Sequence, residues 1–546
     1  MYTLRWNEIE PRFTALLNED PAPHQLPSWL KRWSDLEKIV WEARAGLKRD
    51  RSRDETNMKA QRAFQRFLDE VFSPYQVINQ QLKTKLLGMP ASVPEHVQML
   101  RCLRAEAEIF CQENVPLQAE IAALSSTYQQ KIWEMTVQME GETIPLPQVE
   151  ERAAGQEWAW RLVWQRWLEE RETFDQLFLE LLKKRRQLAY NAGFGDYRAY
   201  RWQEMWRLDY TPVDCLALHQ AIETEIIPLA RTWREARRQA LGLTSIRPWK
   251  QDDFEHMSSR PFADVQVLEA LLSGVFHQLD PEFGALFERM RHGYLDLGSR
   301  HGKPHGGEEW IFPVTGLPYV RAYTSGSYDD VNLVLHECGH ALHDALSLAQ
   351  QDLFWNMGGP DEFCEFAAIT MTYLAKPYLE QQHGGPYTPE LASYLFRRQL
   401  EEVAVKWLPS IAVVDAFQHW VYVEAPEQVT PAELDAKWLE LSRRFDTGID
   451  WSGLEAEQAA GWQRVSILFS VPFYQVEYLL AHLGALQVWQ KAQQDFPSAW
   501  RAYREALLLG NTRPLPELYQ AAGAELPFRR EVVSQVADLL RSSLRQ

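Results

Sequence analysis

The chain lacks the features that mark secreted and disulfide-stabilised proteins. It has only 5 cysteines in 546 residues, and they are scattered along the chain: Cys102, Cys111, Cys215, Cys338 and Cys364. An odd and dispersed set of this kind predicts reduced thiols, and so we expect a cytoplasmic protein. The N-terminus has no basic segment that leads into an apolar run, and no secretory signal is therefore expected.

Long apolar runs and an excess of basic charge are also missing. The longest apolar stretch, residues 471–489, is interrupted by Gln475, Glu477, His482 and Gln487. It is too polar to span a bilayer. The formal net charge is −18 at pH 7. Because nucleic acids and anionic membranes are bound by basic surfaces, we expect neither as a partner. The oligomeric state cannot be predicted from the sequence.

The composition is that of an ordinary globular protein, with 46% hydrophobic and 24% charged residues. Apolar residues recur at spacings of three and four through most of the chain, which predicts a mainly α-helical fold. One hydrophobic core rarely organises 546 residues, so we expect two lobes. We place their boundary near residue 205, with an N-terminal helical lobe over 1–205 and a second lobe over 206–546, which contains the candidate catalytic motif described below.

A glycine- and proline-rich stretch over residues 294–326 interrupts the helical pattern. Within it, Trp310–Phe312 and Tyr319–Tyr323 have the composition of short strands. The free edge of a small sheet can pair with an extended peptide, and we therefore predict Tyr319, Arg321 and Tyr323 as substrate-binding residues. His301 and His305 lie in the same stretch and are more typical of exposed loop histidines.

The sequence His-Glu-Cys-Gly-His at 336–340 follows an apolar run and predicts a metal-binding helix over about 330–345. Residues four apart lie on one helix face, so His336 and His340 can bind one zinc ion. A catalytic zinc has three protein ligands and keeps a further position for water, which Glu337 is placed to deprotonate. The alternative is an ordinary helix with two buried histidines.

The third zinc ligand is expected from the following helical segment, Asp361–Leu374, and we assign it to Glu365. Cys364 is the alternative, although thiolates are commoner in closed structural sites. Glu362 lies one turn before Glu365 and can orient a ligating histidine, or can simply be an N-terminal helix charge. His343 points away from a metal bound by the i, i+4 pair, so we assign it a supporting role outside the ligand set.

These segments resemble the oligoendopeptidase F and thimet oligopeptidase family of zinc metallopeptidases. The similarity includes His336–His343, Glu362–Glu365, Ala189–Phe194, Phe417–Tyr422, Trp462–Arg464 and Pro472–Tyr474 with Tyr478, and it covers about residues 185–490. It implies a two-lobed helical peptidase with a deep substrate channel and a small sheet beside the zinc helix. It also implies one zinc per chain, short peptide substrates, and Tyr478 and Tyr474 as hydroxyl donors to the reaction.

The predicted function is zinc-dependent hydrolysis of short oligopeptides, in which a zinc-bound water activated by Glu337 attacks the scissile carbonyl. One departure from the family affects this prediction, because the family's oxyanion-donating histidine falls on Ile467. The alternative is therefore a zinc-binding, peptide-binding protein with weak or altered catalysis. A helical scaffold braced by zinc is a further alternative. His482 is about three helical turns beyond Pro472, which makes it a poor substitute donor.

Overall fold

The computed structural model describes residues 4–89, 96–139, 141–153, 155–251 and 260–543. The predicted mainly α-helical fold is confirmed, and the described residues contain two small sheets. None of the described helices is both long and apolar enough to cross a membrane.

Packing divides the chain into two compact units, each assembled from three separate segments. Unit 1 comprises Met1–Glu108, Ser258–Phe396 and Ala481–Leu526, and unit 2 comprises Ile109–Met257, Arg397–Leu480 and Pro527–Gln546. These units differ from two consecutive stretches that meet at residue 205. The lobe boundary near 205 stays a prediction.

Unit 1 holds the His-Glu-x-x-His motif. Its helices are α1 (Trp6–Asn18), α2 (Leu26–Ser52), α3 (Met58–Phe67), α4 (Ser73–Leu87), α13 (Val265–Leu279), α14 (Pro281–Arg291), α15 (Tyr328–Gln350), α16 (Asp361–Leu374), α23 (Phe496–Leu508) and α24 (Leu515–Ala521). Its strands are β3 (Leu295–Gly298), β4 (Gly307–Phe312) and β5 (Leu317–Thr324). Among the described helices, three continue from one unit into the other: α5 (Val97–Ile109), α17 (Pro389–Glu402) and α22 (Gln475–Ala492).

The described residues of unit 2 are helical apart from the hairpin of β1 (Thr136–Met139) and β2 (Glu142–Pro145), which the sequence did not predict. Its helices are α6 (Asn114–Glu134), α7 (Leu146–Arg152), α8 (Glu157–Glu169), α9 (Arg171–Asn191), α10 (Tyr197–Glu204), α11 (Pro212–Ala221), α12 (Ile227–Ala240), α18 (Leu408–His419), α19 (Pro431–Arg444), α20 (Glu455–Ala459), α21 (Ser466–Ser470) and α25 (Arg530–Ser543). Its core includes an aromatic stack in which the rings of Tyr128 and Phe469 lie 3.9 Å apart.

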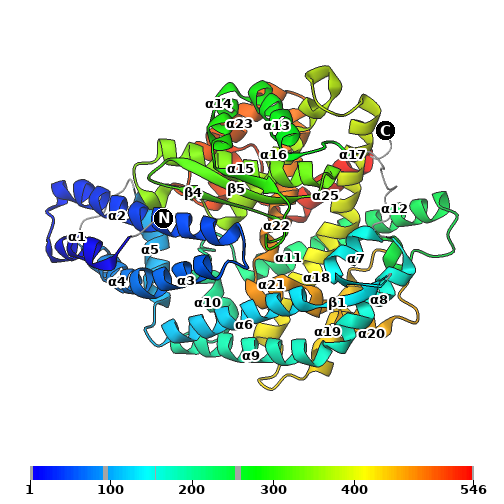
Figure 1. Ribbon diagram of the computed structural model, residues 1–546, viewed down its shortest axis with the longest axis horizontal. Helices are drawn as coiled ribbons and strands as arrows, with labels where there is room; N and C mark the ends of the chain where they lie inside the picture. Colours follow the sequence, from blue (N-terminus) through cyan, green and yellow to red (C-terminus); the bar gives the residue numbers. More distant parts are fainter. Residues whose placement is uncertain (1–3, 90–95, 140, 154, 252–259, 544–546) are drawn as a thin grey trace. The chain divides into compact units, whose positions relative to one another are not determined.

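The three-stranded sheet of unit 1 has the order β3-β5-β4, with β5 parallel to β3 and antiparallel to β4. The two strands over residues 310–323 were predicted, but the third strand, β3, was not. Its pairing with β5 places β5 in the middle of the sheet. Strands β4 and β5 pack against α15, and β4 also contacts α2. Figure 1 shows β4 and β5 beside α15. The predicted small sheet beside the motif helix is therefore confirmed.

The burial of β5 changes the interpretation of its side chains. Tyr319 is fully buried, and its ring lies 4.8 Å from that of Trp310. Arg321 is 5% exposed and donates a hydrogen bond to the carbonyl oxygen of Pro304. Both residues therefore pack within the sheet, and their predicted contact with substrate stays a prediction. Tyr323 is half-buried and stacks on His305, so of the three it is the best placed to meet a ligand.

Candidate metal centre

Helix α15 begins at a hydrogen-bonded cap that fixes the direction of the motif. The Ser327 hydroxyl accepts from the backbone N–H of Asp330, and the Asp330 carboxylate accepts in return from the N–H groups of Ser325, Gly326 and Ser327. Such a cap satisfies the unpaired donors of the first helical turn. The helix then runs without interruption through residues 336–340.

Helix α16 has the bounds that the sequence predicted and packs against α15. The contact is close because Gly339 has no side chain. A Cβ atom at this position would lie 2.6 Å from the Cα atom of Ala368, well inside van der Waals contact. Gly339 thus allows the two helix backbones to approach each other at the level of Ala368, three residues after Glu365.

The structure brings together the three residues predicted as zinc ligands. The Nε2 atoms of His336 and His340 lie 3.3 Å and 3.7 Å from Oε2 of Glu365. One donor atom from each residue lies within 4.8 Å of the other two. A tetrahedral zinc with bonds of about 2.0–2.1 Å separates neighbouring ligand atoms by about 3.4 Å. Both the donor types and their spacing fit a zinc ion.

Electrostatics distinguishes the two histidines. Burial lowers the pKa of His336, but the hydrogen bond and negative charge of Glu365 outweigh burial, and its pKa lies above the ordinary value. Burial dominates at His340 and lowers its pKa to about 4. The difference follows the distances, because Glu365 lies closer to His336. A carboxylate between two imidazoles supplies the negative charge that a divalent cation needs.

Glu337 is buried beside this cluster and does not belong to it. It is 5% exposed, and burial raises its pKa to about 7, opposed by His336 and reinforced by the charge of Glu365. Its carboxylate lies over Gly307 of β4, where a Cβ atom would stand only 2.3 Å from Oε1 of Glu337. The sheet therefore accommodates the Glu337 side chain because residue 307 is a glycine.

The two predicted supporting residues are also buried. His343 is 1% exposed, its ring lies 5.2 Å from that of Phe363, and burial lowers its pKa to about 3. It has no atom among the three clustered donors. Glu362 is 1% exposed and lies one turn before Glu365 on α16. Its predicted contact with a ligating histidine stays a prediction.

Two residues near the site were misjudged or missed by the sequence analysis, which considered His482 only as a poor substitute donor and did not name Glu309. His482 on α22 interacts electrostatically with the site. Burial lowers the pKa of His482 to about 4, the charge of His336 lowers it further, and the charge of Glu365 opposes the shift. The signal was available, because His482 and Tyr478 are four residues apart and share one face of α22. Glu309 of β4 is another, and its pKa is raised by burial and by the charges of Asp344 and Glu337.

The predicted tyrosines belong to unit 2. Tyr474 immediately precedes α22 and Tyr478 lies in its first turns, with their rings 5.6 Å apart. Ile467 lies on the short helix α21, is half-buried, and has no polar atom in its side chain.

Comparisons with known proteins agree with this fold. A structure of oligoendopeptidase F superimposes with a TM-score of 0.91 at 23% identity, covering 100% of this chain and 97% of the other. PZ peptidase A with an inhibitor gives 0.89 at 22% identity, over 98% and 97% of the two chains. An oligoendopeptidase F from Bacillus anthracis str. Ames gives 0.86 at 20%, over 99% and 96%. No curated protein matches the sequence.

These structures share less than a quarter of their residues with this chain and therefore establish the fold alone. Membership comes from the sequence itself. The profile of peptidase family M3 matches residues 150–538, which is most of the chain and includes the His-Glu-x-x-His helix and Glu365. The resemblance noted from the motifs is thereby confirmed, and the chain belongs to peptidase family M3, a family of metallopeptidases.

Proposed function

We propose that the protein is a zinc-dependent endopeptidase that hydrolyses short oligopeptides. The observation that carries the proposal is the position of Glu365 Oε2, at 3.3 Å and 3.7 Å from the Nε2 atoms of His336 and His340. Two imidazoles and one carboxylate form a ligand set typical of catalytic zinc, since three protein ligands leave a position open. One zinc per chain would be held by these side chains.

The chemistry divides between the ion and the protein. Zinc, when bound, polarises a carbonyl oxygen and lowers the pKa of water toward neutrality. Glu337 holds and moves the proton: its carboxylate takes a proton from the attacking water and returns it to the leaving amine. Burial suits it to both steps, because it raises the pKa of Glu337 to about 7, where the carboxyl group can both accept and donate a proton near neutral pH.

The Tyr478 hydroxyl, and less directly that of Tyr474, is proposed to donate a hydrogen bond to the oxyanion that forms on the substrate. Preorganised donors of this kind account for a large part of many rate enhancements. The preference for short peptides, and the channel that would enforce it, rest on the family resemblance. Tyr323 is the proposed substrate contact on the sheet, because it retains some exposed surface.

The alternative function is a zinc-binding, peptide-binding protein with weak or altered catalysis. Ile467 favours it, because this side chain cannot donate a hydrogen bond where the family has a histidine. One experiment separates the candidates: turnover of a fluorogenic peptide, measured with and without a chelator and beside the zinc content and thermal melt. A peptidase of ordinary speed loses a large turnover on chelation, and a peptide-binding protein with weak catalysis has little turnover to lose. A zinc-braced scaffold loses its fold.

A further inference from the structure

Two bulky residues of unit 2 have a left-handed backbone conformation. Trp206 has φ 53° and Phe473 has φ 67°, and they are the only non-glycine residues with positive φ in the described part of the chain. Such a conformation is a genuine outlier for a large side chain and persists only where the surroundings enforce it. Strain of this kind gathers at functional sites. The contacts around both residues therefore indicate what the strain maintains.

The backbone of Phe473 is held from both sides. Its N–H group donates to Oε1 of Gln418 on α18, and its carbonyl oxygen accepts from Nη2 of Arg207 at 2.5 Å. The preceding carbonyl, that of Pro472, accepts from Nε of Arg201 at 3.1 Å. The Phe473 side chain is fully buried. These contacts fix the turn that precedes α22.

Arg207 connects the two left-handed residues. It directly follows Trp206, and its Nη2 atom lies 2.6 Å from Oε1 of Glu477 as well as contacting Phe473. The side chains of Arg207 and Glu477 are both 0% exposed. Glu477 lies in the first turn of α22, three residues after Tyr474 and one before Tyr478. The buried pair thus joins the turn to the helix that carries both tyrosines.

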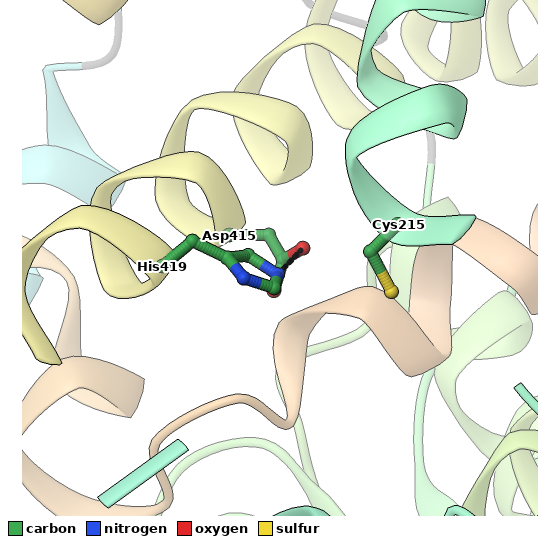
Figure 2. Close-up of side chains that lie close together, drawn as sticks. All are labelled: Cys215, Asp415 and His419. Carbon is green, nitrogen blue, oxygen red and sulfur yellow. Dashed lines mark ion pairs between the residues drawn. The ribbon is translucent and has the colours of Figure 1, made fainter. Parts of the chain in front are cut away.

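A second buried cluster fixes α18, which provides Gln418. His219 Nε2 lies 2.8 Å from Oδ2 of Asp415, and His419 Nε2 lies 3.3 Å from the same oxygen. Cys215 lies nearby, with its sulfur within 4.8 Å of donor atoms of Asp415 and His419, and Figure 2 shows the three side chains together. The His419 ring also packs edge-on against Phe473 at 5.5 Å. The cluster therefore stabilises the Phe473 turn through the ring contact between His419 and Phe473.

Cys215, Asp415 and His419 are residue types that bind zinc, and their donor atoms lie within 4.8 Å of one another. The hydrogen-bond donor beside His419 favours a hydrogen-bonded network instead of a metal site. Arg198 Nη1 lies 3.1 Å from Nδ1 of His419 and can only donate, so Nδ1 accepts. A neutral ring then carries its proton on Nε2, 3.3 Å from Oδ2 of Asp415, and a protonated nitrogen cannot bind a metal.

We propose that Arg207 is a positioning residue for the reaction: paired with Glu477 and bonded to the Phe473 carbonyl, its guanidinium fixes the left-handed turn and thereby the place of the Tyr478 hydroxyl. The inference rests on the proposed function and adds a residue to it. Misplacement of a reacting or stabilising group by about 1 Å can cost about 100-fold in rate. A buried ion pair can hold a backbone turn in place, because its charge-assisted hydrogen bonds are strong and have a specific geometry.

The test variant is Arg207→Met combined with Glu477→Gln. Removing one partner alone leaves a buried charge and threatens the fold, whereas removing both leaves no unpaired charge. The Phe473 carbonyl then loses its donor. Arg234→Met is the matched control, because Arg234 is also buried in unit 2 and donates to two backbone carbonyls, those of Gln251 and Val405, away from the turn. Each variant is also made with Tyr478→Phe.

For the double variant we expect one zinc per chain, a KM within about threefold of wild type, and a kcat lower by about 10- to 100-fold on a short fluorogenic peptide. In the Tyr478→Phe background the same double variant should lower kcat by less than about threefold, because the group it positions is already absent. The Arg234→Met control should keep its kcat.

Two outcomes would overturn the inference about Arg207. One is a folded double variant with the kcat of wild type. The other is a double variant that lowers kcat by the same factor in the Tyr478→Phe background as in the wild-type background. That result would mean that the pair acts through the stability of the fold and not through Tyr478. If the wild-type protein has no zinc-dependent peptidase activity, the proposed function itself fails and this inference fails with it. That result is seen before any variant is made.

Discussion

The Cβ atom that Gly339 lacks would lie 2.6 Å from the Cα atom of Ala368. This contact sets how closely α15 and α16 pack, and the two helices carry all three proposed zinc ligands. Gly339, within the motif, therefore has a structural function of its own. It brings the Glu365 carboxylate within reach of the two imidazoles.

Gly339→Ala should therefore weaken zinc binding. The new methyl group meets backbone, which cannot move aside as a flexible side chain can, so the helices must separate. We expect a lower zinc content by mass spectrometry and a loss of about 1–3 kcal/mol of stability from overpacking. Gly274→Ala on α13 is the matched control, since its Cβ would meet nothing within 4 Å. Equal zinc contents in both variants would contradict the role of Gly339.

The ligand assignment makes a second prediction. Replacing His336, His340 or Glu365 by alanine removes one of three protein donors, and zinc content should fall well below one per chain in each variant. The measurement is metal analysis after dialysis against a weak chelator. Full zinc retention in Glu365→Ala would show that another group, such as the neighbouring Cys364, completes the site.

Parts of this site could be predicted from the sequence because they depend on local spacing. The i, i+4 histidines, the helix that begins at Asp361 and the strands around Trp310 and Tyr319 all follow from short periodic patterns. Contacts between distant segments could not be predicted. Arg207 and Glu477 are 270 residues apart, and Gly307 lies against Glu337 through sheet packing that no local pattern shows. The same limit affected β3, because its four residues acquire strand structure only by pairing with β5.

Ile467 provides a prediction about rate. If the missing histidine limits turnover, Ile467→His should raise kcat on a short peptide by about tenfold or more, since one oxyanion donor is typically worth about 10²–10³ in rate. Ile467→Val is the control that restores no donor. Tyr478→Phe should lower kcat without loss of zinc. A wild-type enzyme of ordinary speed that gains nothing from the histidine would contradict this interpretation of Ile467.

A buried carboxyl group far from the motif predicts a pH dependence of stability. Glu37 of α2 is 1% exposed and accepts from Trp33 Nε1 at 2.9 Å and from the Tyr75 hydroxyl. Burial raises its pKa to about 7, against about 4.3 in the unfolded chain. The folded state therefore binds the proton more tightly, and stability falls as pH rises from about 4.3 to about 7.

The size of the effect is roughly 3 kcal/mol over that range, of which about 2 kcal/mol falls between pH 5 and pH 7, and Glu37→Gln should remove it. The measurement is the free energy of unfolding by urea at pH 5 and pH 7 for both proteins. Glu120→Gln is the control, because this side chain is 57% exposed. An unchanged pH slope in Glu37→Gln would mean that the carboxyl is ionised in the folded protein.

The measurement that tests the central claim most directly is the paired zinc content and peptide turnover of Glu337→Gln. The amide keeps the size of the side chain and its place over Gly307 but cannot accept a proton. If Glu337 is a general base that does not bind the metal, the variant should keep one zinc per chain and lose hydrolysis by about two orders of magnitude or more. Retention of hydrolysis, or loss of zinc in step with activity, would contradict the claim.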